Sequence, residues 1–293
     1  MASGDTMAVD LHVHSTASDG TLSPTEIVRE ASARRLTAVS VVDHDTLAGV
    51  REALTASAGL PIEVIPGLEI NTDVGPLDVH ILGYHFEPGH EPLEQELARV
   101  REARVGRAGR IVARLNELGI GVTMDDVLAQ AGDGAVARPH VAAALVALGV
   151  VGRVQEAFDR FLGRGRPAYV PRYRLTPAQA IAAIRNAGGV PVLGHPGLMG
   201  KDRLIRDLVA QGLEGLEAWH IDHTGFMVEK YQRLAAELGL VVTGGTDSHG
   251  PRGSRPIEIG QVSVPDSVLE PLRLRAEQVR RAAGLPSAGR AFP

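Results

Sequence analysis

Histidine and carboxylate residues recur in short clusters along this chain, and almost every cluster directly follows a β-like apolar run and precedes a turn. The residues concerned are His12, His14, Asp19, Asp43, His44, Asp45, Glu69, His80, His195, Asp247 and His249. This placement constrains the fold, because the ends of successive strands have to meet if the clusters are to share one site. Imidazole nitrogens and carboxylate oxygens are the usual ligands of catalytic transition-metal ions. The pattern therefore predicts a metal centre built from distant parts of the sequence.

The strands that precede these clusters alternate with helices. Apolar runs typical of buried strands cover residues 9–13, 38–42, 62–65, 77–82, 190–193, 216–219 and 240–243. Ser23, followed by Pro24 and Glu26, has the pattern of a capped helix start. Thr176, followed by Pro177, has a similar pattern. Repeated strand–helix units indicate an α/β protein with a parallel sheet that is either open or closed into a barrel.

The middle of the chain shows a helical pattern in place of this alternation. Apolar residues spaced three, four or near multiples apart are Leu93, Leu97, Val100, Ala108, Ile111, Leu115 and Leu118. This spacing predicts a long amphipathic helix. Thr123 with Asp126, and Arg138 with the proline that follows it, predict two further helix starts. We therefore expect a discontinuous barrel domain and, between its halves, a helical insertion: residues 8–90 and 162–285, and residues 91–161.

Composition narrows the range of partners. The net charge of −5 gives no general attraction to a polyanion, which argues against binding of long duplex nucleic acid. The chain has no cysteine, which excludes disulfides, thiolate metal sites and a cysteine nucleophile. No apolar stretch approaches the roughly 20 residues needed to cross a bilayer. We expect a cytoplasmic protein with a small-molecule substrate and no membrane partner.

The type and number of candidate ligands indicate the chemistry. In the run His12-Val13-His14, the strand period of two places both imidazoles on one face, so that both can reach one ion. An isolated pair of this kind is often structural, but the other clusters favour ligation. Nine candidate ligands are too many for one ion, and with Glu69 shared they suit three. Such a site predicts hydrolysis of a phosphoester, because bridged ions lower the pKa of bound water.

Other polar residues have less specific interpretations. Asp43 or Asp45 either orients the His44 ring or caps the turn that follows it. Structural roles are expected for His85, His90 and His220.

Six sequence motifs carry the candidate ligands. They begin at Asp10, Val42, Pro66, Asp78, Leu193 and Gly245 and read DLHVHS, VDHDT, PGLEI, DVHILGY, LGHPG and GTDSHG. Together they resemble the motifs of the PHP (polymerase and histidinol phosphatase) metallophosphoesterases, and the resemblance covers almost the whole chain. It implies a distorted (β/α)7 barrel with an inserted small helical domain and a trinuclear metal site.

The resemblance also implies which residues hold each ion. The first ion would be held by His12, His14, Glu69 and Asp247, the second by Glu69, His80 and His195, and the third by Asp19, His44 and His249. The implied cofactors are two or three divalent ions. Manganese is expected, and nitrogen and oxygen ligands of this kind also accept iron or zinc.

Three further motifs indicate a branch of the family. They begin at Ala137, Gly163 and Glu217 and read ARPHVA, GRGRPAYV and EAWHIDHT. They resemble motifs of the bacterial 3',5'-nucleoside bisphosphate phosphatases, a group whose relatives also trim the 5' ends of short RNAs. By this resemblance Arg138 and His223 contact the substrate phosphate, and Arg164 adds to a basic rim. A guanidinium suits this role because it makes a two-pronged contact with phosphate oxygens.

The sequence therefore predicts a metal-dependent phosphatase that removes the 3'-phosphate of nucleoside 3',5'-bisphosphates. Arg138 would offset charge on the phosphoryl oxygens, and His223 or a metal-bound water would protonate the leaving oxygen.

Three alternatives stay open. Histidinol-phosphate phosphatases share the metal motifs, although the helical insertion argues against this activity. Trimming of RNA is an alternative for short substrates, since the aromatic content of 3% offers few stacking platforms. An inactive metal-binding scaffold is disfavoured because all nine ligand positions are filled.

Overall fold

The computed structural model describes residues 8–75, 77–131, 136–171, 173–253 and 255–286. The chain divides into two compact units. The first, an α/β unit, comprises Met1–Leu97 and Leu175–Pro293, and the second, a helical unit, comprises Ala98–Arg174. The domain limits expected from the sequence stay a prediction.

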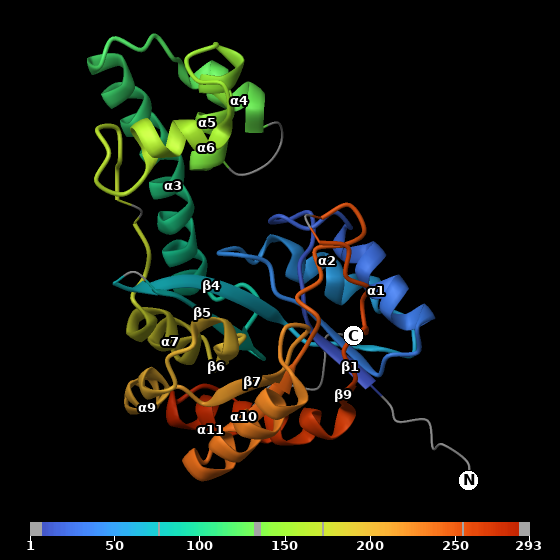
Figure 1. Ribbon diagram of the computed structural model, residues 1–293. Helices are drawn as coiled ribbons and strands as arrows, with labels where there is room; N and C mark the ends of the chain where they lie inside the picture. The colour runs from blue at the N-terminus through green and yellow to red at the C-terminus, as the bar shows by residue number, and fades with distance from the viewer. Residues whose placement is uncertain (1–7, 76, 132–135, 172, 254, 287–293) are drawn as a thin grey trace. The chain divides into compact units, whose positions relative to one another are not determined.

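Strands form the centre of the α/β unit (Figure 1). In the described residues they are β1 (Ala8–Val13), β2 (Ala38–Val41), β3 (Glu63–Val64), β4 (Gly67–Val74), β5 (Leu77–Tyr84), β6 (Val190–Leu193), β7 (Gly215–Trp219), β8 (Val241–Gly244) and β9 (Val264–Pro265). One sheet has the order β3-β2-β1-β9 and the other the order β4-β5-β6-β7-β8. Parallel pairs join β1 to β2, β2 to β3, β6 to β7 and β7 to β8. The α/β class predicted from the strand–helix alternation is confirmed.

The two sheets meet at isolated bridges near the carboxyl ends of their strands. Val13, the last residue of β1, bridges Ser248, which follows β8. His44, which follows β2, bridges Glu69 in β4. These bridges link the sheets into a barrel-like ring whose regular pairing is interrupted at two seams. Both bridges involve or adjoin candidate ligands, so the seams and the candidate site coincide.

Two details of the sheet differ from the expectation. β4 pairs with β5 in antiparallel fashion, and β5 pairs with β6 in the same way. Only two residues separate β4 from β5, too few for the helical crossover that a parallel pair requires. Glu69 lies inside β4 and not after a strand, because the apolar run at 62–65 contributes only the two-residue β3.

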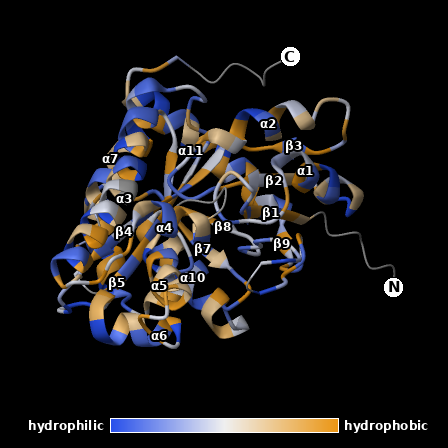
Figure 2. Cartoon of the chain, turned by 90° about the horizontal axis from the view of Figure 1, so that it is seen from above, coloured by the Kyte–Doolittle hydropathy of each residue, from blue (hydrophilic) through white to orange (hydrophobic). Residues whose placement is uncertain are grey.

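Helices cover these sheets. They are α1 (Pro24–Ala33), α2 (Ala48–Ala56), α7 (Pro177–Asn186), α8 (Pro196–Met199), α9 (Arg203–Ala210), α10 (Gly225–Leu238) and α11 (Leu269–Ala282). Both predicted helix starts are confirmed, since Ser23 accepts a hydrogen bond from the Glu26 amide and Thr176 accepts one from the Gln179 amide. Hydrophobic and hydrophilic residues are interleaved around these helices (Figure 2), as expected of helices with one face on a sheet. None of the described helices is both long and apolar enough to cross a bilayer.

Strands β1 and β5 also contribute to an apolar part of the interior of the α/β unit. Leu11 of β1 lies in one buried cluster with Leu82 and Tyr84 of β5. The Tyr84 hydroxyl donates to the Leu11 carbonyl at 2.8 Å, so the polar atom of this buried ring is satisfied across the core.

The helical unit has its own core. Its elements are the part of α3 (Glu91–Glu117) beyond residue 97, then α4 (Met124–Ala131), α5 (Arg138–Ala147), α6 (Val154–Ala157) and a π-helical turn (Phe158–Leu162). Leu115 of α3, Val127 of α4 and Leu145 of α5 lie in one buried cluster. Thr123 and Asp126 form the expected reciprocal cap, in which Thr123 Oγ1 accepts the Asp126 amide at 3.1 Å. The amphipathic helix and both helix starts predicted here are confirmed.

Candidate metal centre

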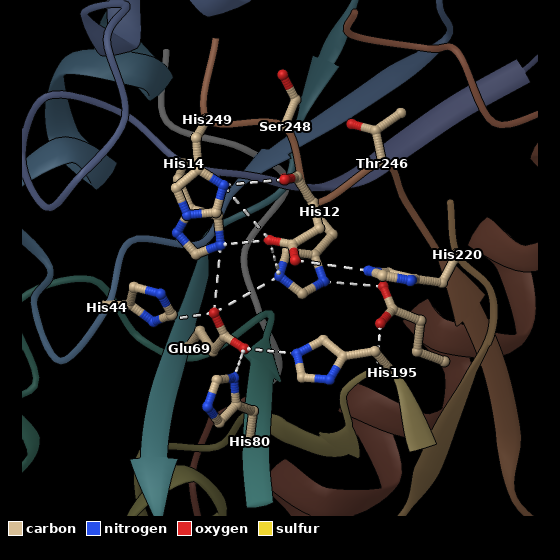
Figure 3. Close-up of polar contacts among 12 residues, drawn as sticks. His12, His14, His44, Glu69, His80, His195, His220, Thr246, Ser248 and His249 are labelled. Carbon is tan, nitrogen blue, oxygen red and sulfur yellow. Dashed lines mark hydrogen bonds and ion pairs between the residues drawn. The ribbon is translucent and has the colours of Figure 1, made fainter. Parts of the chain in front are cut away.

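All nine candidate ligands lie in one cluster, and Figure 3 labels seven of them. Glu69 and His80 lie within strands, and the others lie near or after the carboxyl ends of strands. By element they are His12 in β1, His14 and Asp19 after β1, His44 after β2, Glu69 in β4, His80 in β5, His195 after β6, and Asp247 and His249 after β8. Each has a side-chain nitrogen or oxygen within 3.4 Å of such an atom of another member. Residues that are remote in sequence therefore meet at one end of the barrel-like ring.

Glu69 lies at the centre of this cluster. Its Oε2 lies 3.2 Å from His14 Nε2 and 3.0 Å from His44 Nδ1. Its Oε1 lies 2.6 Å from His80 Nδ1 and 3.2 Å from His195 Nε2. The two oxygens of this buried carboxylate thus face separate pairs of imidazoles (Figure 3), which is the geometry expected of a carboxylate shared between two ions.

Two more carboxylates complete the cluster. Asp247 Oδ1 lies 3.4 Å from His12 Nε2 and 3.1 Å from His14 Nε2. Asp19 Oδ1 lies 3.3 Å from His249 Nε2. Within the described chain, three sets have their ligand atoms within 4.8 Å of one another: His12, His14 and Asp247; His12, Glu69 and His195; and His14, Asp19, His44 and His249. These sets overlap with the expected division into three ions but differ from it, because His80 belongs to none of them and Glu69 to only one. The assignment of each ligand to an ion therefore stays a prediction.

Several buried atoms of the cluster have no hydrogen-bond partner among the described residues. They are His12 Nε2, His14 Nδ1 and Nε2, His44 Nδ1 and Glu69 Oε2. A buried polar atom left unsatisfied costs about 1–3 kcal/mol, so such a concentration requires another way to satisfy these atoms. Divalent transition-metal ions provide one, because they bind imidazole nitrogen and carboxylate oxygen. The residues present fit such ions.

Burial and charge act in opposite directions on these groups. Burial raises the pKa of Glu69 and Asp247, but the surrounding histidines outweigh burial and lower both pKa values. Burial lowers the pKa of His12, whereas the carboxylates of Glu217, Asp247 and Glu69 raise it well above its usual value. Without metal, the carboxylates of Glu69 and Asp247 therefore favour the ionised form and the His12 ring favours the protonated form. Binding of a metal by His12 has to displace a proton.

Strained backbone marks three positions of the site. The φ angles of Asp45, His195 and Asp247 are 54°, 26° and 55°. A positive φ is costly for residues other than glycine and persists only where surrounding contacts enforce it. The contacts around these residues therefore determine where the ligands point.

Glu217 in β7 belongs to the site, although the sequence analysis gave it no role. It is fully buried, and its Oε1 lies 2.9 Å from His12 Nδ1. Its Oε2 accepts a hydrogen bond from the His195 amide at 2.6 Å. The available signal was a lone carboxylate inside an otherwise apolar strand, since Glu is almost never buried without a partner.

His220 also lies in the site, against the expectation of a purely structural role (Figure 3). Its side chain is fully buried, and its Nε2 lies 3.5 Å from Asp247 Oδ2. Its Nδ1 accepts a hydrogen bond from the Asp222 amide at 3.2 Å, so the proton of the neutral ring is on Nε2. His220 Nε2 therefore lies close to a candidate ligand but makes no hydrogen bond with the described residues.

Two other aspartates tie the strands to the loops that carry ligands. Asp43 accepts hydrogen bonds from the Ser15 amide at 2.8 Å and the Ser18 hydroxyl at 2.6 Å, which fixes the loop leading to Asp19. The sequence analysis considered Asp43 as a partner of the His44 ring or as a cap of the next turn, and neither role includes these contacts.

Asp10 makes a comparable connection at the other end of the sequence. Its carboxylate accepts from the Thr246 amide at 2.9 Å, the Thr246 hydroxyl at 2.7 Å and the Gly260 amide at 2.8 Å. The first strand is thereby held to the segment that follows β8.

His223 lies beside the cluster in a defined protonation state. Its Nδ1 donates to the Ala218 carbonyl at 2.8 Å, and its Nε2 accepts from the Gly197 amide at 3.1 Å. Burial, together with the charge of His220, lowers its pKa. The ring is therefore neutral, and its Nε2 carries no proton while the contact with Gly197 lasts.

Arg138, the predicted phosphate-binding arginine, is the first residue of α5 in the helical unit. Its guanidinium carbon lies 5.6 Å from the ring centroid of Phe158 and 5.8 Å from that of Tyr169. Its Nη1 donates to the Leu162 carbonyl at 3.4 Å. Two aromatic faces and one carbonyl thus hold the guanidinium in place.

Arg164, the other candidate in the helical unit, is exposed. His140, in the same motif as Arg138, has a structural contact, since its Nδ1 accepts a hydrogen bond from the Ala137 amide at 3.1 Å at the start of α5. Arg107, to which the sequence analysis gave no role, is buried and donates to the Val170 carbonyl at 2.8 Å. Burial and then the charge of Arg138 lower the pKa of Arg107 to about 10. This buried guanidinium stays charged at neutral pH.

The fold and the cluster together define the class of protein. The PHP domain family matches residues 10–112. A relative that is more than a third identical over 90% of this chain extends the match to both units. The chain belongs to the PHP domain family and is a metal-dependent phosphoesterase, a hydrolase of phosphate esters.

Individual relatives carry more specific names. A 5'-3' exoribonuclease of Haemophilus influenzae is 38% identical over 270 residues, which cover 90% of this chain and 97% of that protein. A 3',5'-nucleoside bisphosphate phosphatase of Chromobacterium violaceum is 34% identical over 256 residues, covering 85% of this chain and 90% of that protein.

Two solved structures are similar to this chain over most of its length. A protein of Bifidobacterium adolescentis classed as a metal-dependent phosphoesterase has a TM-score of 0.74 and 34% identity, with 92% of this chain and 96% of that chain covered. An amidohydrolase of Chromobacterium violaceum, with bound sulfate and no metal, has a TM-score of 0.70 and 31% identity at the same coverage.

Proposed function

We propose that this chain is a phosphatase that removes the 3'-phosphate of nucleoside 3',5'-bisphosphates with two or three divalent metal ions. The observation that carries the proposal is the position of Glu69, whose two carboxylate oxygens face different pairs of imidazoles. The Chromobacterium violaceum phosphatase, 34% identical over most of its length, supports the choice of substrate.

The proposed ligands are those expected from the sequence. His12, His14, Glu69 and Asp247 would hold the first ion, Glu69, His80 and His195 the second, and Asp19, His44 and His249 the third. Bound ions of this kind activate a water and neutralise charge on the phosphoryl oxygens. The chain's own contribution is to hold nine ligand side chains in place before substrate arrives. Manganese is the proposed metal, and iron or zinc fits the same ligands.

Substrate contacts are proposed for three residues outside the metal cluster. Arg138 would bind phosphate oxygens in two-pronged fashion, with its guanidinium already held by Phe158 and Tyr169. Arg164 would add positive charge from an exposed position. His223 would contact phosphate through Nε2. Both this role and that of a proton donor to the leaving oxygen require its contact with Gly197 to open and Nε2 to take up a proton from water.

A panel of substrates tests this proposal. Protein that has been freed of metal and then supplied with Mn²⁺ is assayed for phosphate release from adenosine 3',5'-bisphosphate, adenosine 5'-monophosphate and histidinol phosphate. The expected result is fastest release from the bisphosphate, with adenosine 5'-monophosphate as the product. Faster release from histidinol phosphate would support the alternative phosphatase activity and contradict this proposal.

A second candidate activity is trimming of short RNA from its 5' end. The Haemophilus influenzae exoribonuclease favours it, because 38% identity extends over 97% of that protein. The test is incubation of a 5'-phosphorylated RNA of about six nucleotides with the Mn²⁺-loaded protein. Stepwise release of mononucleotides from the 5' end would support the activity, and an intact oligomer would exclude it.

The proposed setting is the cytoplasm, with nucleotides or short RNA as partners. The net charge of −5 argues against long duplexes, for which a protein needs an extended positive surface.

A further inference from the structure

We infer that Glu217 is a positioning residue that fixes the ring of one metal ligand and the backbone of another. The inference rests on the proposed ligand set, but it does not depend on which phosphate ester is the substrate.

The first contact determines which nitrogen of His12 is available to a metal. Glu217 Oε1 lies 2.9 Å from His12 Nδ1, and since a carboxylate only accepts, Nδ1 must carry the proton. In the neutral ring that binds a metal, the opposite nitrogen, Nε2, then presents its lone pair to the cluster. It lies 3.4 Å from Asp247 Oδ1 and 3.6 Å from Glu69 Oε2, and it has no hydrogen-bond partner among the described residues. A carboxylate behind a ligating histidine also makes that ligand more basic.

The second contact holds a strained main chain. Glu217 Oε2 accepts the His195 amide at 2.6 Å, and His195 has a φ of 26°, outside the regions that such a residue prefers. The amide direction and the side-chain direction at one residue are linked through its backbone angles. The Glu217 contact therefore helps to keep His195 Nε2 at 3.2 Å from Glu69 Oε1.

Glu217 belongs to none of the three sets of potential ligands found in the described residues. Both of its oxygens already accept hydrogen bonds, and the residue is fully buried in β7. It thus acts from behind two ligands that the proposed assignment gives to different ions. One side chain would set the spacing between these ions.

This arrangement requires a carboxylate. Two N–H donors, one from His12 and one from His195, approach the two oxygens of Glu217. Glutamine has the same shape but only one acceptor, so its NH₂ group must face one of the donors. If it faces the His12 ring, Nδ1 must become the acceptor, and the proton moves to Nε2, which can then no longer bind a metal. If it faces His195, the strained backbone loses its support.

The variant Glu217→Gln tests this inference. Metal content by elemental analysis and Mn²⁺ affinity by competition with a chelator are measured for the wild type and the variant. We expect a 10- to 100-fold loss of Mn²⁺ affinity, the range typical when the hydrogen-bond partner of a metal ligand is removed. Unchanged affinity and metal content would overturn the inference.

The matched control is Glu214→Gln. Glu214 directly precedes β7 and pairs with Arg275, with 2.6 Å between its Oε2 and Arg275 Nη1, and it touches no proposed ligand. The same chemical change should lower thermal stability here without altering Mn²⁺ affinity. Equal losses of affinity in both variants would show a general structural effect and overturn the specific role of Glu217.

A second measurement examines the wild-type ring directly. In wild-type protein loaded with diamagnetic Zn²⁺, nitrogen NMR of labelled histidine locates the His12 ring proton, with assignment by its loss in His12→Gln. The expected result is a proton on Nδ1 and metal on Nε2. Metal on Nδ1, or a proton on Nε2, would overturn the inference. Failure of the wild type to bind any metal would instead contradict the proposed ligand set.

Discussion

The α/β unit and the helical unit differ in what they bury. The α/β unit encloses ionisable groups, and His12, Glu69 and Glu217 have no exposed surface. The helical unit encloses mainly apolar side chains, such as Leu115 and Leu145, although it also buries Arg107. Buried charge requires a compensating partner, whereas an apolar core depends on close packing. The first unit should therefore respond to metal and pH, and the second to changes of side-chain volume.

The largest expected effect comes from removing a ligand in the α/β unit. Asp247→Ala should lower the turnover number about a thousandfold, because metal ions contribute several kcal/mol of transition-state stabilisation and each 1.4 kcal/mol is worth tenfold. Activity is measured with saturating Mn²⁺, and far-UV circular dichroism checks the fold.

The control also replaces an aspartate with alanine, but in the helical unit. Asp126→Ala removes the carboxylate that accepts from the Thr123 amide and hydroxyl at the start of α4, and should cost about 1 kcal/mol of stability while turnover and metal content stay unchanged. Near-normal turnover in Asp247→Ala would contradict the assignment of chemistry to the α/β unit.

The next effect belongs to the helical core. Leu145→Ala should lower the free energy of unfolding by about 2–5 kcal/mol, since it leaves a cavity in a buried cluster. Urea titration of the whole chain measures this loss, and elemental analysis should show wild-type metal content. Loss of metal in this variant would contradict the expectation that metal binding does not depend on the packing of the helical core.

A smaller effect is expected where the helical unit is proposed to contact substrate. Arg138→Lys keeps the charge but loses the planar, two-pronged donor, so KM for the bisphosphate should rise roughly tenfold. Arg164→Lys, a change at an exposed arginine, should alter KM less than Arg138→Lys. Equal effects at both positions would reduce the role of Arg138 to that of a general positive charge.

The smallest effect is a pH dependence confined to the metal-free α/β unit. The pKa values of His12, His14, His195 and His249 are raised above 6.5. Their contribution to stability is fully present below that pH and is lost as the pH rises through the folded-state pKa values. The pKa of His85, which burial lowers to about 4, changes stability only below this range.

Thermal unfolding with and without Mn²⁺, from about pH 6 to about pH 9, measures this dependence. The metal-free protein should lose stability as the pH rises. The stabilisation by Mn²⁺ should increase over the same range, because fewer protons compete for the ligands. A metal-free protein that becomes more stable with rising pH would contradict the predicted sign.

Much of the α/β architecture and the whole set of nine candidate ligands could be predicted, because the signals are local. A ligand pair such as His12 and His14 is visible within three residues, and a capped helix start such as Ser23 within four. The antiparallel β4–β5 pair was missed because an apolar run does not show strand direction. The two-residue connection contained that information, since it excludes a parallel crossover.

The supporting residues of the site could not be predicted in the same way. Glu217 and His220 act through partners that lie far away in sequence, at His12 and Asp247. No short motif reports such a contact, and only burial in the folded chain shows that each needs a partner. Arg107 was missed for the same reason, because its contact with Val170 spans the helical unit.

The tie between Asp10 and the segment at Thr246 and Gly260 has a consequence for synthesis of the protein. Translation delivers His12 to the growing chain long before His249. A nascent chain halted between these residues contains most of the imidazoles but lacks the segment that Asp10 holds beside the first strand. The three carboxylates and six imidazoles can therefore assemble only after that later segment has been made.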